Sequence, residues 1–503
     1  MKQNNFKQIF IAFLIVIGFS IKSFAQDKKQ PNVLFVIVDD WGYKDMSLHG
    51  SQIYQTPNVD KLAKEGVDFQ NAYSSYPRCV PSRYGIMTGT YPINEDHGNL
   101  GKIKDEKNFI KKFNNAGYNS FYVGKWHLGS EESSPKGYGF KQSFAAGDAG
   151  GTDSHFYPYN IKRVAGTKGE KAPIEDVTEY AHEGEFLSDA LTRRTIEYIK
   201  EDNSKPFIGV LAFYAVHTPI EAKPEDVERN KKEIDAFDYG DTPEYITEGN
   251  GVTRMRQNDP TYAGLVENTD ENIGKLIQAL KDNGLYDNTI IVLTSDHGGL
   301  STKGKNNRIV PTSNAPFRAG KGWIYEGGIK VPLFVHYPKE IEPRVESESI
   351  ILGMDIFPTL TDYVLHERVN GIDGKSFKNV LKGKENWNDR TVYWNSYKAR
   401  PTQTGDSKTS AIRVGDYKLL HFVETDKIEL YNVKEDVSEK NDLSSKMPEK
   451  TTELLVLLNK WKTDKKVTMK ANHKSGDKKE LTPKQLAKKE ARKAERKAEK
   501  TKE

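Results

Sequence analysis

Cysteine is almost absent from this sequence, since Cys79 is the only one among 503 residues. A single cysteine excludes an intramolecular disulfide, so an apolar core has to stabilise the chain, and its length is ample for one. A length of this order also predicts one or two domains. Cys79 is then either a small buried side chain beside a turn or a functional group.

The sequence also lacks an apolar run long enough to cross a membrane comfortably. The apolar stretch at residues 9–19 follows Lys2 and Lys7 and precedes Ser23-Phe24-Ala25, a small-x-small cleavage site. Residues 1–25 are therefore predicted to be a cleaved signal peptide, with an uncleaved anchor as the alternative. No cysteine lies near the cleavage site to carry a lipid. We expect a periplasmic or secreted protein without a stable membrane span.

The body of the chain lacks an excess of positive charge, although the whole sequence has a net charge of +4. Residues 464–503 hold 15 Lys and Arg against 7 Asp and Glu, whereas residues 26–463 hold 57 against 64. An acidic body argues against nucleic acid as a partner. The basic tail, 464–503, is rich in Lys, Glu and Ala and is predicted to be a solvated helix or disordered. Binding to an acidic polysaccharide or a membrane surface is the alternative for the tail.

Four apolar runs of strand length each lead to polar residues. The runs are residues 33–38, 121–123, 207–214 and 290–293, and they precede Asp39-Asp40, Lys125 with His127, His217, and Asp296-His297. Continuous β-branched runs fit strands that are buried on both faces of a mostly parallel sheet. Because ligands gather at the carboxyl ends of such strands, we expect these polar side chains at one edge of the sheet.

Helical segments alternate with the apolar runs, at about residues 57–65, 107–116 and 268–280. This alternation predicts an α/β fold, a large mostly parallel sheet sandwiched by helices, over residues 26–385. Short hairpin-like runs follow at 391–394, 410–413, 417–421 and 428–431, and then a helix near 450–461. Residues 386–463 are therefore predicted to form a smaller α+β subdomain on an antiparallel sheet.

The most informative segment is Cys79-Val80-Pro81-Ser82-Arg83, followed by Thr88-Gly89. Pro81 suits the first turn of a helix, where a missing N–H is harmless. The prediction is a helix over about 82–88 that ends at Gly89 and has Cys79 at its N-terminus. Unsatisfied N–H groups and a partial positive charge at that end favour an oxyanion.

Three aspartates follow two of the strand-like runs. Asp39, Asp40 and Asp296 offer hard oxygen ligands of the kind that calcium or magnesium prefers. Two adjacent aspartates at a buried strand end would repel each other strongly without a cation. The alternative is that Asp39 and Asp40 are solvated in a loop.

Taken together, these segments resemble the type I, formylglycine-dependent sulfatases of the alkaline phosphatase-like superfamily, among them secreted bacterial polysaccharide sulfatases and arylsulfatases. The resemblance covers about residues 31–445 and keeps the family's order and approximate spacing. Its motifs are Pro31–Asp40, the segment around Cys79, Gly124–Gly129, His217–Pro219, Ser295–Gly298, Gly320–Gly322, Tyr325–Gly328, Met354–Thr359 and Glu429–Asn432.

The resemblance implies a chemistry for the site. In this family a maturation enzyme oxidises the cysteine to formylglycine (3-oxoalanine), and a hydroxyl of the hydrated aldehyde attacks sulfur. His217 would protonate the leaving alcohol, and His127 would deprotonate the second hydroxyl so that sulfate leaves. Arg83 would bond the formylglycine, and Lys125 and Lys321 would hold sulfate oxygens. One calcium ion would be held by Asp39, Asp40, residue 79, Asp296 and His297.

Two positions depart from the common pattern of the family. His297 stands where many relatives have Asn, and an imidazole is a softer donor than calcium prefers. Lys330 stands where Arg is common, and Lys lacks the bidentate fork of a guanidinium. Five further residues lie on predicted loops that could meet a sugar: His97, His155, Asn314, Arg318 and Trp323.

The predicted function is hydrolysis of sulfate esters in a sulfated carbohydrate, such as an algal polysaccharide like ulvan or a glycosaminoglycan. One alternative is a formylglycine-dependent hydrolase of phosphate or phosphonate esters, since Lys125 and Lys321 would bind either anion. Another is a non-catalytic protein that binds sulfated glycans. The sugar, the sulfated position, endo or exo action and the oligomeric state do not follow from the sequence.

Overall fold

A large sheet forms the centre of the computed structural model, which describes residues 30–94, 100, 103–159, 174, 176–201 and 204–469. The predicted signal peptide, residues 470–503 of the predicted tail, and His97 lie outside the described residues. Within the described ranges, no helix combines the length and the apolar character needed to cross a bilayer.

Among the described residues the sheet has eight strands, and all of them run in one direction except β11, which is antiparallel to its neighbours β2 and β9. This confirms the predicted mostly parallel sheet. In spatial order the strands are β12 (Arg344–Glu346), β2 (Val67–Phe69), β11 (Leu333–His336), β9 (Thr289–Ser295), β1 (Asn32–Val38), β6 (Phe207–Ala212), β4 (Asn119–Gly124) and β5 (Gln142–Phe144).

Strand β1 shows why the continuous apolar runs form the middle of the sheet. All of its residues are buried, and it pairs with β9 on one side and β6 on the other. Leu34, Val36 and Val38 point into one core, whereas Val33 and Phe35 point into the other. Side chains alternate between the faces of a strand, so both faces of this sheet need apolar residues at every position.

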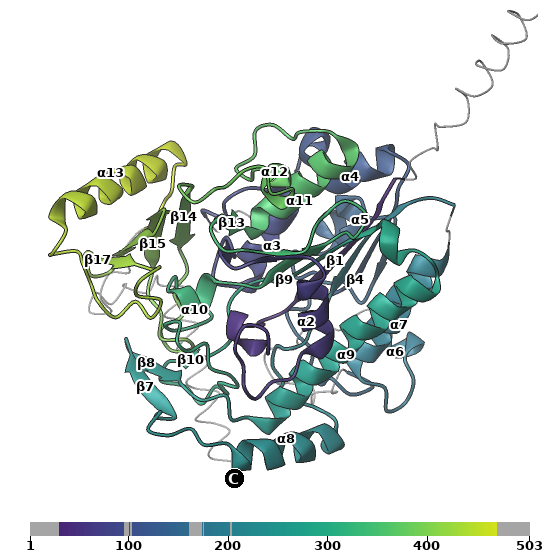
Figure 1. Ribbon diagram of the computed structural model, residues 1–503, viewed down its shortest axis with the longest axis horizontal. Helices are drawn as coiled ribbons and strands as arrows, with labels where there is room; N and C mark the ends of the chain where they lie inside the picture. Colours follow the sequence, from purple (N-terminus) through teal and green to yellow (C-terminus); the bar gives the residue numbers. More distant parts are fainter. Residues whose placement is uncertain are drawn as a thin grey trace, which may run out of the picture.

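Helices cover both faces of the sheet (Figure 1). One layer consists of α2 (Pro57–Lys64), α7 (Leu187–Glu201), α8 (Pro224–Ala236) and α9 (Pro260–Asp282). The other consists of α3 (Cys79–Thr88), α4 (Phe109–Asn115), α11 (Ile356–Leu360) and α12 (Lys378–Leu381).

The predicted start of helix α9 was wrong by eight residues. The helix begins at Pro260 rather than near Asn268, because Asp259 caps it and Pro260 occupies its first turn. The Asp259 carboxylate accepts hydrogen bonds from the backbone N–H groups of Thr261 and Tyr262. An Asp-Pro pair before an apolar-periodic segment is a helix start signal that the sequence already contained.

Shorter elements connect the layers. β7 (Tyr245–Glu248), β8 (Gly251–Arg254) and β10 (Thr302–Lys303) form a small sheet, and β3 (Ala72–Tyr73) pairs with β13 (Ile351–Leu352). One-turn helices are α5 (Pro135–Tyr138), α6 (Val177–Tyr180) and α10 (Glu326–Ile329). Short 3₁₀ turns are η2 (Tyr43–Asp45), η5 (Asp105–Lys107), η6 (Glu131–Ser133), η7 (Tyr286–Asn288) and η8 (Gly353–Asp355), and η9 (Thr361–Leu365) is a π-helical turn.

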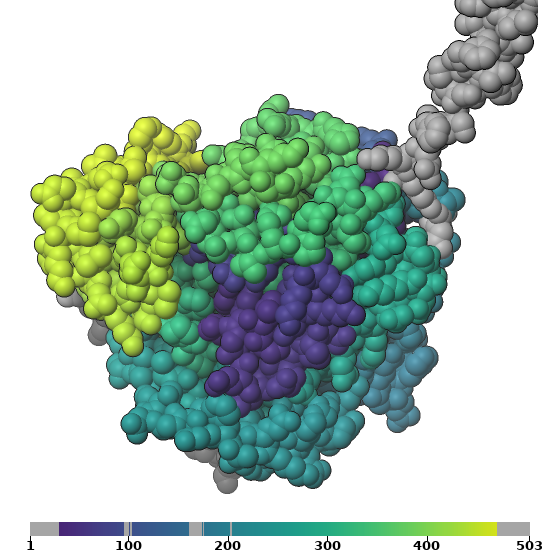
Figure 2. Space-filling view, in the orientation of Figure 1, coloured from purple at the N-terminus to yellow at the C-terminus, as the bar shows by residue number. Residues whose placement is uncertain are grey.

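The C-terminal region forms a separate antiparallel sheet, as predicted. Its strands are β14 (Thr391–Ser396), β15 (Thr409–Val414), β16 (Tyr417–Phe422) and β17 (Lys427–Asn432). Helix α13 (Pro448–Asp464) covers one face through Leu454, Leu458 and Trp461. The other face packs against the parallel-sheet domain, and the two parts lie in direct contact (Figures 1 and 2).

Helix α13 passes the predicted limit at residue 463 by one residue, and contacts continue beyond it. Lys465 forms an ion pair with Asp373, and Val467 packs against the core of the C-terminal sheet. The first residues of the predicted tail therefore belong to the folded part, because Lys465 contacts the parallel-sheet domain and Val467 contacts the C-terminal sheet.

Lys418 of β16 joins the two parts of the chain. Its ammonium is fully buried and lies 2.7 Å from Glu326 of α10 and 2.7 Å from Glu439. It also donates to the carbonyl of Ile324. Breaking a buried ion pair by removing one partner leaves an uncompensated charge in the interior. Lys418 is therefore one of the buried contacts that hold the C-terminal sheet to α10.

We expect Lys418→Met to lower the free energy of unfolding by ~3–5 kcal/mol, since two buried carboxylates lose their cation. Urea unfolding followed by fluorescence measures the change. The matched control is Lys434→Met at an exposed position, for which the loss should stay within about 0.5 kcal/mol. Equal losses in the two variants would contradict a structural role for the buried network.

Candidate functional site

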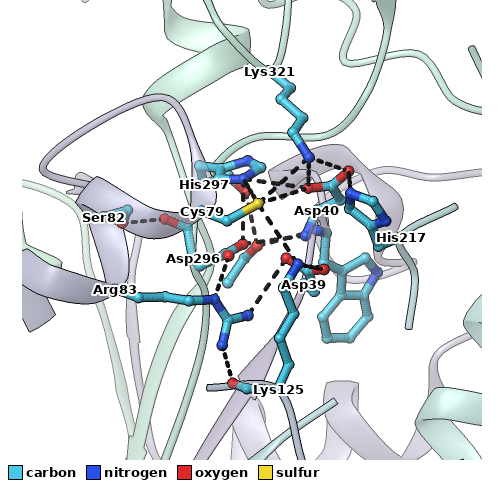
Figure 3. Close-up of polar contacts among 12 residues, drawn as sticks. Asp39, Asp40, Cys79, Ser82, Arg83, Lys125, His217, Asp296, His297 and Lys321 are labelled. Atoms are coloured by element: carbon cyan, nitrogen blue, oxygen red, sulfur yellow. Dashed lines mark hydrogen bonds and ion pairs between the residues drawn. The ribbon is translucent and has the colours of Figure 1, made fainter. Parts of the chain in front are cut away.

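The polar residues that follow the central strands meet at one edge of the sheet, as predicted. Strands β9, β1, β6 and β4 are neighbours and run parallel, so their carboxyl ends lie together. Asp39-Asp40 follow β1, Asp296-His297 follow β9, Lys125 follows β4, and His217 lies five residues after β6. Figure 3 shows these side chains converging on Cys79.

Cys79 is the first residue of α3 and is 7% exposed. Its Sγ lies 3.2 Å from His297 Nε2, 3.5 Å from Lys321 Nζ and 3.7 Å from Lys125 Nζ. Burial raises the pKa of the thiol, but the charges of Lys125 and Lys321 outweigh burial and bring that pKa well below its usual value. The site thus favours a negative charge at residue 79.

Two lysines reach the aspartates that follow β1. Lys125 Nζ binds Asp39 Oδ2, and Lys321 Nζ donates to both carboxylate oxygens of Asp40 at 2.6 and 2.8 Å. Asp40 has a φ of +61°, a left-handed conformation that Asp adopts more readily than most residues. Burial acts to raise the pKa of both carboxyls, but the nearby lysines hold each pKa below its ordinary value.

Arg83 connects the aspartates that follow β1 and β9. Its Nε donates to Asp296 Oδ2 at 2.9 Å, its Nη2 to Asp39 Oδ1 at 3.4 Å and its Nη1 to the carbonyl of Lys125 at 2.6 Å. The Ser82 hydroxyl donates to the backbone carbonyl of Asp296. With the thiol present, Arg83 binds the groups around residue 79, and its bond to the formylglycine hydroxyl stays a prediction.

Asp296 and His297 are neighbours whose pKa values are both raised. Burial raises the pKa of Asp296 to about 7, and the neighbouring charge of Asp39 adds to this effect. Burial opposes protonation of His297, but Asp296 and Cys79 together raise its pKa to about 9. Negative neighbours contribute to both shifts, and a cation bound among these groups would oppose them.

The two predicted acid–base histidines are half-buried and neutral near pH 7. Burial and the charge of Lys125 lower the pKa of His127 to about 3, and burial and the charge of Lys321 lower that of His217 to about 4. His217 Nδ1 lies 2.8 Å from the carbonyl of Thr218, and its Nε2 lies 3.8 Å from Asp40 Oδ2. A Cβ on Gly150 would lie 2.4 Å from the His127 ring, so only glycine allows this approach.

A cavity of about 670 Å³ opens over these groups. Cys79, His127, His217 and Lys321 all line it, so the predicted nucleophile, both histidines and one predicted sulfate ligand face the same space. A volume of this size accommodates one or two sugar rings.

The structure brings together the whole set of predicted site residues. They are Asp39, Asp40, Cys79, Arg83, Lys125, His127, His217, Asp296, His297 and Lys321. Two groups of metal-ligating side chains lie close enough to share an ion, with ligand atoms within 4.8 Å of one another. The groups are Asp39, Asp40, Cys79 and His217, and Asp39, Cys79, Asp296 and His297. Buried carboxylates suit a hard divalent cation.

Four of the residues on loops that could meet a sugar make contacts within the protein instead, and none of these four lines the cavity. The Asn314 amide donates to four partners that include the carbonyls of Gly299 and Gly327, and Arg318 pairs with Glu248. The Trp323 indole donates to the carbonyl of Thr404, and His155 Nε2 lies 3.2 Å from the carbonyl of His217. Lys330, the other departure noted in the sequence, also lies outside the lining; its Nζ is over the rings of Tyr43, Tyr73 and Phe317.

Sequence reasoning missed a group of basic and aromatic residues that line the cavity. Arg78 directly precedes Cys79, and this adjacency was a signal in the sequence. The others come from loops whose position depends on the fold: Arg308 after β10, and Tyr397, Lys398 and Arg400 between β14 and β15.

Family models match most of the folded chain. The model described as "Sulfatase" matches residues 31–365, and the model described as "N-sulphoglucosamine sulphohydrolase, C-terminal" matches residues 319–464. Together they span both the parallel sheet and the C-terminal antiparallel sheet.

Several known proteins are similar to this chain over most of its length. A "Sulfatase" of Formosa agariphila is 27% identical, over 84% of this chain and 86% of that protein. The N-acetylglucosamine-6-O-sulfatase of Bacteroides thetaiotaomicron is 26% identical, over 86% of each. The crystal structure of Ps i-CgsB in complex with k-i-k-neocarrahexaose is 27% identical, with a TM-score of 0.68 over 89% of this chain and 96% of that one.

The family model covers more than half of the chain, and the residues that approach Cys79 belong to the segments it matches. The chain therefore belongs to the sulfatase family and is a sulfuric ester hydrolase.

Proposed function

We propose that this protein is an exported sulfatase that removes sulfate from a sulfated carbohydrate, with residue 79 converted to formylglycine by a maturation enzyme. The observation that supports it best is the position of Cys79, at a helix N-terminus between Lys125 and Lys321, with His127 and His217 lining the same cavity. The names of two relatives, an N-acetylglucosamine-6-O-sulfatase and a protein in complex with k-i-k-neocarrahexaose, support a sulfated carbohydrate as the substrate. The proposed substrate class is a glycosaminoglycan or an algal polysaccharide such as ulvan.

The residues divide into three tasks. Sγ of Cys79 occupies the place that the formylglycine oxygens would take, so residue 79 supplies the nucleophile. Lys125 and Lys321, each within 3.7 Å of this atom, hold the sulfuryl oxygens and neutralise the charge that develops on them. Arg83 positions Asp39 and Asp296 through the bonds described above.

The two histidines move protons. His217 bonds the Thr218 carbonyl through Nδ1, so it gives a proton to the oxygen of the departing alcohol from Nε2 of a doubly protonated ring. The negative charge of a bound sulfate ester favours that protonated form. His127 takes a proton from residue 79 when sulfate is released. General acid–base steps of this kind each contribute roughly 10²–10⁴-fold to a rate.

Calcium is the proposed metal ion, one per chain, held by Asp39, Asp40, Asp296 and His297 together with residue 79. The donor set fits it, because three buried carboxylates crowd together and Asp296 is raised in pKa by burial and by its neighbour. When bound, a divalent cation withdraws electron density from the sulfate oxygens.

The proposed nucleophile predicts a mass change. In active protein the tryptic peptide 79–83 should be about 18 Da lighter than its cysteine form, because CH₂SH becomes CHO, whereas ordinary thiol oxidation adds mass. Mass spectrometry of that peptide measures it. Cys79→Ala should fold normally and hydrolyse neither 4-nitrophenyl sulfate nor 4-nitrophenyl phosphate.

A fully active sample that contains only the thiol at position 79 would contradict this prediction. A wild-type preference for the phosphate ester over the sulfate ester would point instead to the phosphate or phosphonate hydrolase alternative.

The metal site predicts a calcium-dependent melting temperature. Binding to the native state alone stabilises it by about 2.7 kcal/mol at a ligand concentration of 100 times Kd, so prolonged chelation should lower the melting temperature and added calcium should restore it. Asp296→Asn should weaken both responses. Asp287→Asn, at an exposed turn, is the matched control and should respond as wild type does. A chelator-insensitive melting temperature in demonstrably metal-free wild type would rule out the site.

The role of His217 predicts a dependence on the leaving group. His217→Ala should reduce kcat roughly 10²–10⁴-fold on a sugar sulfate, whose alkoxide needs a proton, and far less on 4-nitrophenyl sulfate, whose phenolate leaves unassisted. His182→Ala, at an exposed position, serves as the control. Steady-state kinetics on both substrates give the comparison. Equal losses on the two esters would show that His217 does not protonate the leaving oxygen.

A further inference from the structure

The cavity over Cys79 has more positive charge than one sulfate group requires. Five basic residues line it, and none of its described lining residues is an Asp or a Glu. Lys321 belongs to the proposed sulfate site, whereas Arg78, Arg308, Lys398 and Arg400 lie outside that site. Three of these four are arginines, the residue whose planar fork matches carboxylate and sulfate oxygens.

Arg78 is held rigidly while part of its guanidinium has no partner. Its side chain is buried, with the residue 5% exposed, and Nη2 donates to Asp406 Oδ1 at 2.7 Å and Thr404 Oγ1 at 2.8 Å. Its Nε and Nη1 make no hydrogen bond within the described protein, although the residue lines the cavity. Leaving buried donors unsatisfied costs free energy, so an acceptor inside the cavity would find these groups oriented in advance.

Arg308 and Arg400 approach from two other loops. Arg308 lies in the loop after β10, and Arg400 lies in the loop between β14 and β15. Among the described residues, neither guanidinium forms an ion pair with a carboxylate within 4.0 Å. Burial lowers the pKa of Arg400, and the charges of Arg78 and Arg308 lower it further. Like charges are therefore brought together at the cavity, and among the described residues only Arg78 of these three arginines has an ion-pair partner, Asp406.

We infer that Arg78, Arg308 and Arg400 form a second anion subsite, which binds a carboxylate or a second sulfate next to the sulfate being removed. The inference rests on the proposed function and narrows its substrate class to glycans that carry two anionic groups within reach of one cavity. A neutral sugar ring with a single sulfate would leave Nε and Nη1 of Arg78 without an acceptor and the charges of Arg308 and Arg400 without an anion. The C-terminal subdomain takes part in this recognition through Arg400.

The test uses inhibition of 4-nitrophenyl sulfate hydrolysis by disaccharides that share one sulfated hexose. Their second ring is neutral, carries a sulfate, or is a uronate. For wild type, at least one of the doubly anionic compounds should inhibit roughly tenfold more strongly than the singly anionic one, as one extra charge-assisted contact predicts. The stronger of the two identifies sulfate or carboxylate as the second group.

The variants assign this preference to the subsite. In Arg308→Gln/Arg400→Gln the ratio of inhibition constants between singly and doubly anionic compounds should fall close to one. Lys305→Gln removes the same charge from an exposed position in the same loop that does not line the cavity, and it should keep the wild-type ratio. A purely structural role of the arginines would change all inhibition constants together and leave the ratio intact.

Calorimetry on Cys79→Ala measures binding of the same disaccharides without turnover. Equal affinity for singly and doubly anionic compounds in wild type and in Cys79→Ala would overturn the subsite, even with normal hydrolysis of 4-nitrophenyl sulfate. If wild type does not hydrolyse 4-nitrophenyl sulfate but still binds doubly anionic disaccharides more tightly than singly anionic ones, the proposed function would be wrong and the subsite would be retained.

Discussion

Three buried carboxylates and three buried cations are paired around Cys79, and the arrangement of the site depends on this charge balance (Figure 3). The pairs link residues from the ends of β1, β4 and β9 to Arg83 of α3 and to the loop that carries Lys321. None of these charges is tolerable alone in the interior, because each costs several kcal/mol to desolvate. Each loop therefore holds the others in position. The proposed divalent cation would leave the set net positive, as binding of a sulfate ester requires.

The C-terminal subdomain is part of the site rather than an appendage to it. Through Lys418 and Glu439 it anchors α10, which follows Lys321 by only five residues. Through the loop between β14 and β15 it also supplies one wall of the cavity. Contacts with α10 and part of the cavity lining thus come from the same subdomain.

Much of the fold could be predicted from local sequence. The four central strands are continuous apolar runs because both faces of a parallel sheet are covered, and α2 carries its proline and N-cap signals in the expected places. The predicted start of α9 was wrong because the prediction did not use Asp259 as the N-cap and Pro260 as the first residue of the helix. Asn314, Arg318 and Trp323, which lie on loops that could have met a sugar, make contacts inside the protein instead. Their side chains bond to backbone and carboxylate groups more than a dozen residues away, and no local pattern reveals such partners.

The sequence by itself determined the fold class, the family motifs and the set of polar residues that follow the strands, because strand burial and helix caps are encoded over a few neighbouring residues. Only the tertiary structure decided which charges pair. It assigned Arg83 to Asp296 and Asp39, and it placed Arg308 and Arg400 beside Arg78. These contacts join residues separated by up to several hundred positions. Their geometry follows from how the sheets and loops pack, which no local pattern contains.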